Sequence, residues 1–551
     1  MSRRALLFLL SVVVSTVSTM AQSPDHVRDL QLRAMETKTA SWGHWGTDPG
    51  KYSDWTNHSN RLIPVYTFGI SLDSLSGEHS VYRDAAKLKS LYGELPEGTL
   101  QVDASYFDQT DIHHLQMRAV EAGKKNIILF VFDGMDWQTT WAAATYQRHS
   151  VVYHEGHGTG LRFLDYDNAK TDFGFCVTSA HHDKATFDVD AQIVLDGQKG
   201  DAGGYDPQRG GSTPWEAAKS REYLIGKDRS RPHLVTDSAS SATSMTTGLK
   251  TYNAAINVSV DGEKLEPIAR RLQREQGFSV GIVTSVPISH ATPAAAYANN
   301  VTRNDYQDLT RDLLGLSSAS HREPLPGADV VIGAGWGVAS DADKNQGRNF
   351  AAGNLYVDLE DLRRVDVLNG GRYVVAQRTA GVDGTRALND AASRAAKTGS
   401  RLLGFYGTDQ AHLPFRTADG RFDPAKDVKG TEAYTPADIH ENPTLADMTE
   451  AALSVLGENE KGFWLMVEPG DVDWANHANN IDNSIGAVLS GDEAFAATTA
   501  WIEENDAWDE TVVIVTADHG HHFVLLEPEA IAGLAIETDG AEEESNDGSQ
   551  E

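Results

Sequence analysis

Carboxylate and imidazole side chains gather in two short segments toward the end of the sequence. In the first, EPGDVDWANH at 468–477, Asp473 and His477 stand four residues apart. This spacing puts both side chains on one face of a helix, where they can bind the same metal ion. The second segment, TADH at 516–519, offers an oxygen ligand and a nitrogen ligand in succession. One such pair is common by chance, but each segment here follows an apolar run, which favours a metal site.

Three carboxylates come directly at the ends of apolar runs that are typical of buried strands. They are Asp133, Glu468 and Asp518. In open α/β sheets, binding sites form at the carboxyl ends of the strands. Without neutralisation, carboxylates gathered at one sheet edge would repel one another, so the pattern indicates bound cations.

A serine hydroxyl is the candidate nucleophile. Ser238 follows Asp237 and precedes a run of small residues, so its hydroxyl is expected at a helix start, where free N–H groups favour an anion. The same pattern is also typical of an ordinary N-capped helix rich in Ser and Ala. Farther along, the segment HATPAAAYANNVTR at 290–303 contains Thr292, a hydroxyl ligand, and Arg303, whose guanidinium is suited to bidentate phosphate contact.

Short apolar runs, hydrophobic on both faces, are expected to form the strands that position these groups. The runs are Asn126–Phe132, Ser279–Val283, Val330–Ile332, Leu402–Tyr406, Phe463–Val467 and Thr511–Val515. Helix-like segments such as 267–275 and 389–397 lie between several of them. This alternation predicts an α/β fold, a three-layer αβα sandwich with a mostly parallel central sheet.

The rest of the chain divides by composition. Residues 22–120 are expected to be an N-terminal extension, an embellishment rich in Trp, Tyr, Ser and Asp, before a catalytic domain at 121–536. About 304–450 is expected to be an inserted subdomain, because it separates two strands that carry site residues. Residues 195–212 have the composition of a surface loop. The acidic tail 537–551 is expected to be disordered.

The first residues have the order of a secretory signal peptide at 1–21, with a basic start, an apolar run and a small-residue end at Ala21. The apolar run is too short for a membrane span, so a periplasmic or secreted protein is expected, exported by the Sec or the twin-arginine route. The formal net charge of −32 excludes a basic nucleic-acid footprint. A single cysteine, Cys176, excludes an intrachain disulfide framework.

Taken in order, these segments resemble the alkaline phosphatases. The matching pieces are NIILFVFDGM at 126–135, TDSASSATSMTTGLKTYNAAINV at 236–258, GIVTSVPISHATPAAAYANNVTR at 281–303, MVEPGDVDWANHANNID at 466–482 and VVIVTADHGH at 512–521. The resemblance implies two Zn²⁺ and one Mg²⁺ per subunit. The metal ligands that it implies are Asp133, Asp518 and His519 for one zinc, Asp473 and His477 for the second zinc, and Asp133, Thr292 and Glu468 for magnesium.

The resemblance also implies metal-dependent hydrolysis of small phosphate monoesters, with Ser238 as the nucleophile of a phosphoserine intermediate and Arg303 as the residue that holds the phosphate. Elementary chemistry agrees, because a serine is a weak nucleophile unless a base or a metal activates it. The alternatives are a phosphodiesterase or sulfatase of the same superfamily, and a degenerate phosphate- or metal-binding protein without turnover. The sequence leaves monomer and homodimer both open.

One ligand of the second zinc is missing from its usual place. Alkaline phosphatases typically take it from a histidine well downstream of the TADH segment, whereas 551 − 519 = 32 residues follow His519 here. Because catalytic zinc usually has three protein ligands, we expect His521 to complete this site or to hold Asp473 in place. The alternatives are a truncated chain and a ligand from the insertion.

Overall fold

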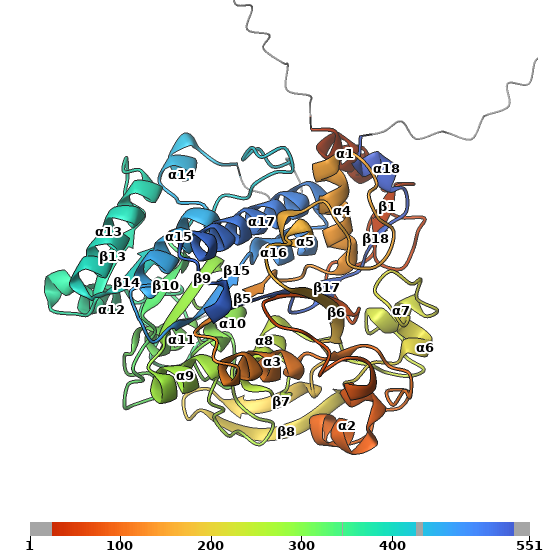
Figure 1. Cartoon of the computed structure of the whole chain (residues 1–551), viewed down its shortest axis with the longest axis horizontal. Coiled ribbons are helices and arrows are strands. Elements are labelled where there is room, and N and C mark those ends of the chain that lie inside the picture. Colours follow the sequence, from red (N-terminus) through yellow and green to blue (C-terminus); the bar gives the residue numbers. More distant parts are fainter. Residues whose placement is uncertain (1–24, 344, 426–432, 534–551) are drawn as a thin grey trace, which may run out of the picture.

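A ten-stranded sheet runs through the centre of the protein in the order β13-β14-β10-β9-β15-β5-β16-β3-β6-β4. The computed structural model describes residues 25–343, 345–425 and 433–533 (Figure 1). The strands of the central sheet are β3 (Ile63–Phe68), β4 (Phe107–Asp108), β5 (Asn126–Val131), β6 (Thr171–Val177), β9 (Ser279–Pro287), β10 (Val330–Ala334), β13 (Tyr373–Gln377), β14 (Arg401–Phe405), β15 (Phe463–Glu468) and β16 (Thr511–Thr516). From β13 to β16 all neighbours are parallel, whereas β3 runs antiparallel to both β16 and β6.

Helices cover both faces of this sheet, as Figure 1 shows, and the predicted three-layer α/β architecture is confirmed. One layer contains α1 (His26–Thr37), α4 (Trp137–Arg148), α5 (Arg162–Asp165), α13 (Gly384–Thr398), α15 (Leu445–Leu456) and α17 (Ile481–Glu504). The other contains α3 (Thr110–Glu121), α8 (Ser238–Thr247), α9 (Ile268–Gln276), α10 (Ala291–Ala295) and α11 (Tyr306–Leu314). Because both faces are covered, every residue of β5, β15 and β16 is buried, which explains their continuous apolar sequences.

The first and last described segments of the chain lie side by side. Three strand pairs join them, all antiparallel: β1 (Gly43–Trp45) with β18 (Phe523–Leu525), β2 (His58–Ser59) with β17 (Gly520–His521), and β3 with β16. Next to these pairs, His26 Nε2 lies 2.7 Å from the carbonyl oxygen of Ile531. The region expected to be an N-terminal embellishment is therefore built into the central sheet.

Two further expectations differ from the structure. Residues 304–450, expected as an inserted subdomain, contribute β10, β13 and β14 to the same sheet, because these strands pair in parallel beside β9. Residues 195–212, expected as a loop, contain most of β8 (Ile193–Ala202), which pairs with β7 (His182–Asp188) in an exposed hairpin. The other short elements are α2 (Ala85–Tyr92), α6 (Pro207–Gly210), α7 (Arg221–Leu224), β11 (Ala339–Ser340), β12 (Gly353–Asn354), α12 (Leu359–Val365), α14 (Pro436–His440), α16 (Asp471–His477) and α18 (Pro528–Ile531).

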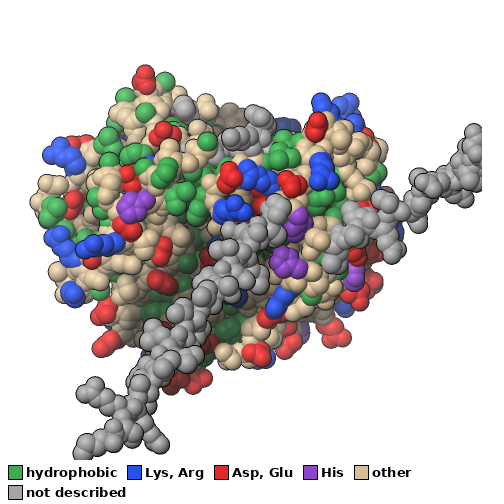
Figure 2. All heavy atoms as spheres, turned by 90° about the horizontal axis from the view of Figure 1, so that it is seen from above, with side chains coloured by type: hydrophobic (Ala, Val, Ile, Leu, Met, Phe, Trp, Pro, Cys, Tyr) green, Lys and Arg blue, Asp and Glu red, His purple; other side chains and the backbone are tan. Residues whose placement is uncertain are grey.

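On the face seen in Figure 2, Asp and Glu side chains are spread over the surface with Lys and Arg side chains between them. Among the described residues, no helix has both the length and the apolar composition needed to cross a bilayer. The predicted signal peptide at 1–21 and the acidic tail at 537–551 lie outside the described residues.

Candidate functional site

The three carboxylates predicted at strand ends meet at one edge of the sheet. Asp133 follows β5, Glu468 ends β15 and Asp518 follows β16, and these three strands are neighbours in the order β15-β5-β16. All three side chains are buried. The parallel register places their carboxyl ends together, so the structure brings the predicted carboxylates into one site.

A first group of candidate metal ligands consists of Asp133, Asp518 and His519. His519 Nε2 lies 3.5 Å from Asp133 Oδ1 and 3.2 Å from Asp518 Oδ2. A tetrahedral zinc ion with bonds of about 2.0–2.1 Å keeps its ligand atoms about 3.3–3.4 Å apart. The donor atoms of this group therefore fit one zinc ion.

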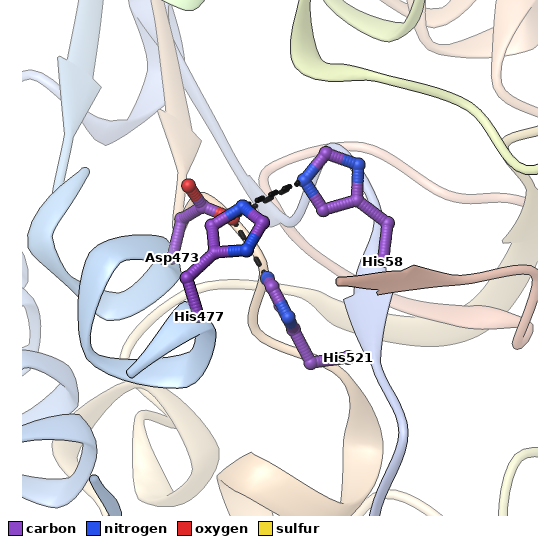
Figure 3. Close-up of side chains that lie close together, drawn as sticks. All are labelled: His58, Asp473, His477 and His521. Atoms are coloured by element: carbon purple, nitrogen blue, oxygen red, sulfur yellow. Dashed lines mark hydrogen bonds and ion pairs between the residues drawn. The ribbon is translucent and has the colours of Figure 1, made fainter. Parts of the chain in front are cut away.

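A second group consists of His58, Asp473, His477 and His521 (Figure 3). Asp473 and His477 lie on one face of α16, as their spacing predicts. His58 comes from β2, and His521 comes from β17, which pairs with it. Three of the six donor-atom separations have the length expected for ligands of one tetrahedral ion: His58 Nε2–His477 Nε2 at 3.1 Å, Asp473 Oδ1–His477 Nε2 at 3.5 Å and Asp473 Oδ1–His58 Nε2 at 3.6 Å.

The geometry gives His521 a different place in this group. Its Nε2 is only 2.7 Å from Asp473 Oδ1, which is a hydrogen-bond distance and shorter than the separation of two ligands on one zinc ion. His521 was expected either to complete the zinc site or to hold Asp473, and the contact favours the second role. His58, which sequence reasoning missed, lies at the distance from Asp473 and His477 that a third candidate ligand would have.

A third set of oxygen atoms adjoins the first group. Thr292 Oγ1 lies 3.5 Å from Asp133 Oδ2, the oxygen of Asp133 that is not directed at His519. Glu468 accepts a short hydrogen bond from Thr284, and its other oxygen, Oε1, has no hydrogen-bond partner in the described ranges. Hard oxygen donors of this kind suit Mg²⁺.

Electrostatics also fit a cation-binding site. Burial raises the pKa of Glu468 to about 8 and that of Asp518 to about 7, and neighbouring carboxylates add to both shifts. Burial would also raise the pKa of Asp473, but the imidazoles of His477 and His521 hold it well below its usual range. Asp133 Oδ1 and Asp518 Oδ2 are buried and have no hydrogen-bond partner within the described part of the chain. Bound cations would satisfy these atoms and offset the repulsion.

Removal of divalent metal with EDTA is therefore expected to lower the Tm, and to lower it more above about pH 8 than below about pH 7. The folded-state pKa values of Glu468 and Asp518 are raised, so the folded protein binds more protons than the unfolded chain and loses stability as the pH rises through them. Differential scanning calorimetry of EDTA-treated and metal-loaded protein measures this. Equal Tm values for the two forms across this pH range would contradict the cation site.

The glycine after Asp133 permits the close packing of these groups. Gly134 has φ +74°, and its N–H donates to Asp518 Oδ1 at 2.9 Å. A Cβ atom at Gly134 would lie 2.9 Å from His521 Cδ2 and 3.1 Å from Asp473 Cα. Both the left-handed backbone and the lack of space therefore require glycine at this turn.

Ser238 lies at the start of α8, with Asp237 as the N-cap. Its Oγ is 3.2 Å from His519 Nε2, the same separation that His519 has from Asp518 Oδ2. Ser238 is therefore both the first residue of a capped helix and a direct neighbour of the first ligand group. The hydroxyl occupies a position from which it can reach an ion bound there.

A cavity of about 360 Å³ opens onto Ser238 and onto three residues of the second ligand group, His58, Asp473 and His477. Arg303 lines it and forms an ion pair with Asp237, Nη1 to Oδ2, at 3.1 Å. His290 and Trp474 form another part of its wall, with ring centroids 5.8 Å apart. The predicted nucleophile, the predicted phosphate-holding arginine and the ligands of the second group thus surround one open space.

Helices cover both faces of a mostly parallel sheet, and two groups of candidate metal ligands lie beside a buried serine at its edge. These features are typical of a metal-binding α/β protein. Comparison with known proteins gives the family: the model described as alkaline phosphatase matches residues 205–543. The chain is 32% identical over 335 residues to the alkaline phosphatase of Escherichia coli (strain K12), a match that covers 56% of this chain and 63% of that protein. It is 30% identical over 343 residues to streptomycin-6-phosphate phosphatase of Streptomyces griseus, a match that covers 58% of this chain and 69% of that protein. The chain belongs to the alkaline phosphatase family.

The solved structure of Thermus thermophilus alkaline phosphatase aligns with a TM-score of 0.42 and 23% identity, over 72% of this chain and 60% of that one. The chain spans less than two thirds of the length of the E. coli relative. The family match at 205–543 also leaves out His58 and Asp133. The signal that could have revealed His58 is weak: a histidine shortly before the mostly apolar run IPVYTF at 63–68.

Proposed function

We propose that the protein hydrolyses small phosphate monoesters through a phosphoserine intermediate on Ser238. The observation that carries this proposal is the 3.2 Å contact of Ser238 Oγ with His519 Nε2, on a cavity that Arg303 also lines. Ser238 Oγ attacks phosphorus, and the alcohol oxygen leaves with the bonding electron pair. A water oxygen then attacks the phosphoserine, Ser238 Oγ leaves, and inorganic phosphate is released.

We propose two Zn²⁺ and one Mg²⁺ as cofactors. Asp133, Asp518 and His519 would hold one zinc; His58, Asp473 and His477 would hold the other; and Asp133, Thr292 and Glu468 would hold magnesium. When bound, these ions would lower the pKa of the serine hydroxyl and neutralise charge on the oxygens of the phosphoryl group.

The chain's own residues orient the substrate. Arg303 offers a fork of donors to the phosphoryl oxygens, and Asp237 holds the guanidinium at the cavity wall. His521 donates to Asp473 and keeps that carboxylate turned toward His58 and His477. The helix start at Ser238 adds free N–H groups that favour the transferred anion.

Hydrolysis of 4-nitrophenyl phosphate and of bis(4-nitrophenyl) phosphate, each with and without EDTA, tests this proposal. We expect EDTA-sensitive release of nitrophenol from the monoester and much slower release from the diester. Preference for the diester would favour the phosphodiesterase alternative. No turnover of either ester by metal-loaded protein would favour a binding protein without activity.

Replacing Arg303 with alanine is expected to weaken phosphate binding by about 2–5 kcal/mol, because a buried charge-assisted contact is lost and Asp237 is left without its partner. The inhibition constant of inorganic phosphate measures the loss directly. Arg303→Lys is the matched variant, because lysine retains the charge but not the forked donors of the guanidinium. Its inhibition constant for phosphate should lie between those of wild type and Arg303→Ala. An unchanged inhibition constant in Arg303→Ala would remove Arg303 from the site.

We also propose that residues 1–21 direct export to the periplasm or the outside of the cell, on the sequence order described above.

A further inference from the structure

A second cavity, of about 280 Å³, opens between α4, β18 and the segment 205–224. The labelled elements of this region, α4, β18, α6 and α7, lie on the right-hand side of Figure 1. Its wall is rich in aromatic rings. The ring centroid of Trp137 lies 5.4 Å from that of Trp141 and 5.7 Å from that of Trp215. Flat apolar faces at these separations are suited to binding a planar ring.

Two buried polar side chains of this wall have no hydrogen-bond partner among residues 25–343, 345–425 and 433–533. They are His522, at both ring nitrogens, and Trp141, at Nε1. His522 is 2% exposed and Trp141 is 7% exposed. A neutral imidazole carries one N–H donor, and the indole Nε1–H of Trp141 is a second donor. Buried donors without acceptors are costly, which indicates that a ligand or water supplies the acceptor.

Arg221 adds a positive charge to the same wall. Its guanidinium donates to the carbonyl oxygen of Thr47 at 3.1 Å and has no carboxylate within 4.0 Å in the described part of the chain. Arg61, in contrast, is already paired with Asp136 at 3.0 Å. The wall also contains the carboxylate of Glu216, which is exposed and accepts a hydrogen bond from the N–H of Ser212. Arg221 is therefore available to a bound anion.

This cavity shares no lining residue with the cavity at Ser238. The two are separated by the chain at β17 and β18: His521 contacts Asp473 of the second ligand group, whereas the next residue, His522, lines the aromatic cavity. Successive residues of an extended chain point to opposite sides, which explains how one segment serves both.

We propose that this cavity is a binding site, separate from the catalytic one, for a small planar aromatic anion. The ring packs against Trp137 and Trp215, and the anionic oxygens accept hydrogen bonds from Arg221, Trp141 Nε1 and His522. A carboxylate and a phosphonate or phosphate group share this chemistry, so both are tested below.

Isothermal titration calorimetry of the metal-loaded protein with benzoate tests the proposal. We expect benzoate to bind, and benzyl alcohol, which lacks the charge, and acetate, which lacks the ring, to bind at least about tenfold more weakly, the loss that accompanies one charge-assisted contact or a buried ring. Phenylphosphonate in the same titration decides whether the site prefers a carboxylate or a phosphonate. Benzoate that fails to bind, or that binds no better than both partial analogues, would overturn the proposal.

Substitutions in the cavity wall test whether benzoate binds at this site. Arg221→Ala should weaken benzoate binding by about tenfold or more, and Trp141→Phe, which keeps the ring but removes the N–H, by about threefold to tenfold. Arg83→Ala is the matched control, because Arg83 is also half-buried and also donates to one backbone carbonyl, that of Ala104. Unchanged hydrolysis of 4-nitrophenyl phosphate shows that each variant is folded. Equal benzoate affinity in wild type and Arg221→Ala would overturn the assignment.

Discussion

Replacing Ser238 with alanine is expected to lower kcat for 4-nitrophenyl phosphate by on the order of 10³-fold or more, with metal content and Tm close to wild type. Ser238 is 1% exposed, and its hydroxyl contacts His519 at the first ligand group. Removal of that oxygen leaves the metal ligands and the N-cap Asp237 in place, so only the covalent route is lost. Steady-state kinetics together with metal analysis of the purified variant measure both quantities.

A second serine of the same helix provides the control. Ser244 is also buried on α8, but its hydroxyl only donates to the carbonyl oxygen of Ser240 at 3.0 Å. Ser244→Ala is expected to leave kcat near the wild-type value. If labelled phosphate from the substrate were still trapped covalently in Ser238→Ala after acid quenching, Ser238 would not be the nucleophile.

Replacing His58 with alanine is expected to remove one of the two proposed zinc ions and to lower kcat by about 10²-fold or more, because the second group would keep only Asp473 and His477 as ligands. The buried imidazole lies 3.1 Å from His477 Nε2 and 3.6 Å from Asp473 Oδ1. Mass-spectrometric metal analysis after dialysis should give one zinc fewer per chain than wild type. The ion at Asp518 and His519 should remain bound.

Comparison with His521→Ala separates a ligand from a residue that orients a ligand. His521 contacts Asp473 by a 2.7 Å hydrogen bond, so its loss should weaken the second zinc by about 10–100-fold without abolishing the site. His79→Ala replaces an exposed histidine and should change neither the zinc content nor kcat. The Tm of His58→Ala in EDTA should match that of wild type in EDTA if His58 acts through the metal. Wild-type zinc content in His58→Ala would contradict its assignment as a ligand.

Local pairs of residues and apolar runs could be recognised from the sequence alone. The pairs Asp473–His477 and Asp518–His519 are local, one set by the helical repeat and the other by adjacency, and the structure brings each pair together as predicted. The six apolar runs predicted as strands all lie in the central sheet, because burial on both faces leaves a continuous apolar sequence that can be read without knowing the partner strands.

Features that depend on pairing between strands far apart in the sequence could not be predicted from local patterns. His58 meets His477 across 419 residues of sequence, because β2 pairs with β17 and β3 with β16. Likewise, β13 extends the central sheet beside β14 from a region expected to be an inserted subdomain, and β13 is not among the apolar runs predicted as strands. Periodicity reports which faces of a segment are buried, but not which strand lies beside it.

The sequence by itself determined the α/β class and the family resemblance, and it predicted most residues of the candidate site, since each of these rests on residue types and short spacings. Only the tertiary structure placed His58, from the first strands of the described chain, beside Asp473 and His477 in the candidate site. The physical reason is that a metal site is defined by donor atoms about 3–4 Å apart in space, and backbone pairing between the two ends of the chain sets that distance here.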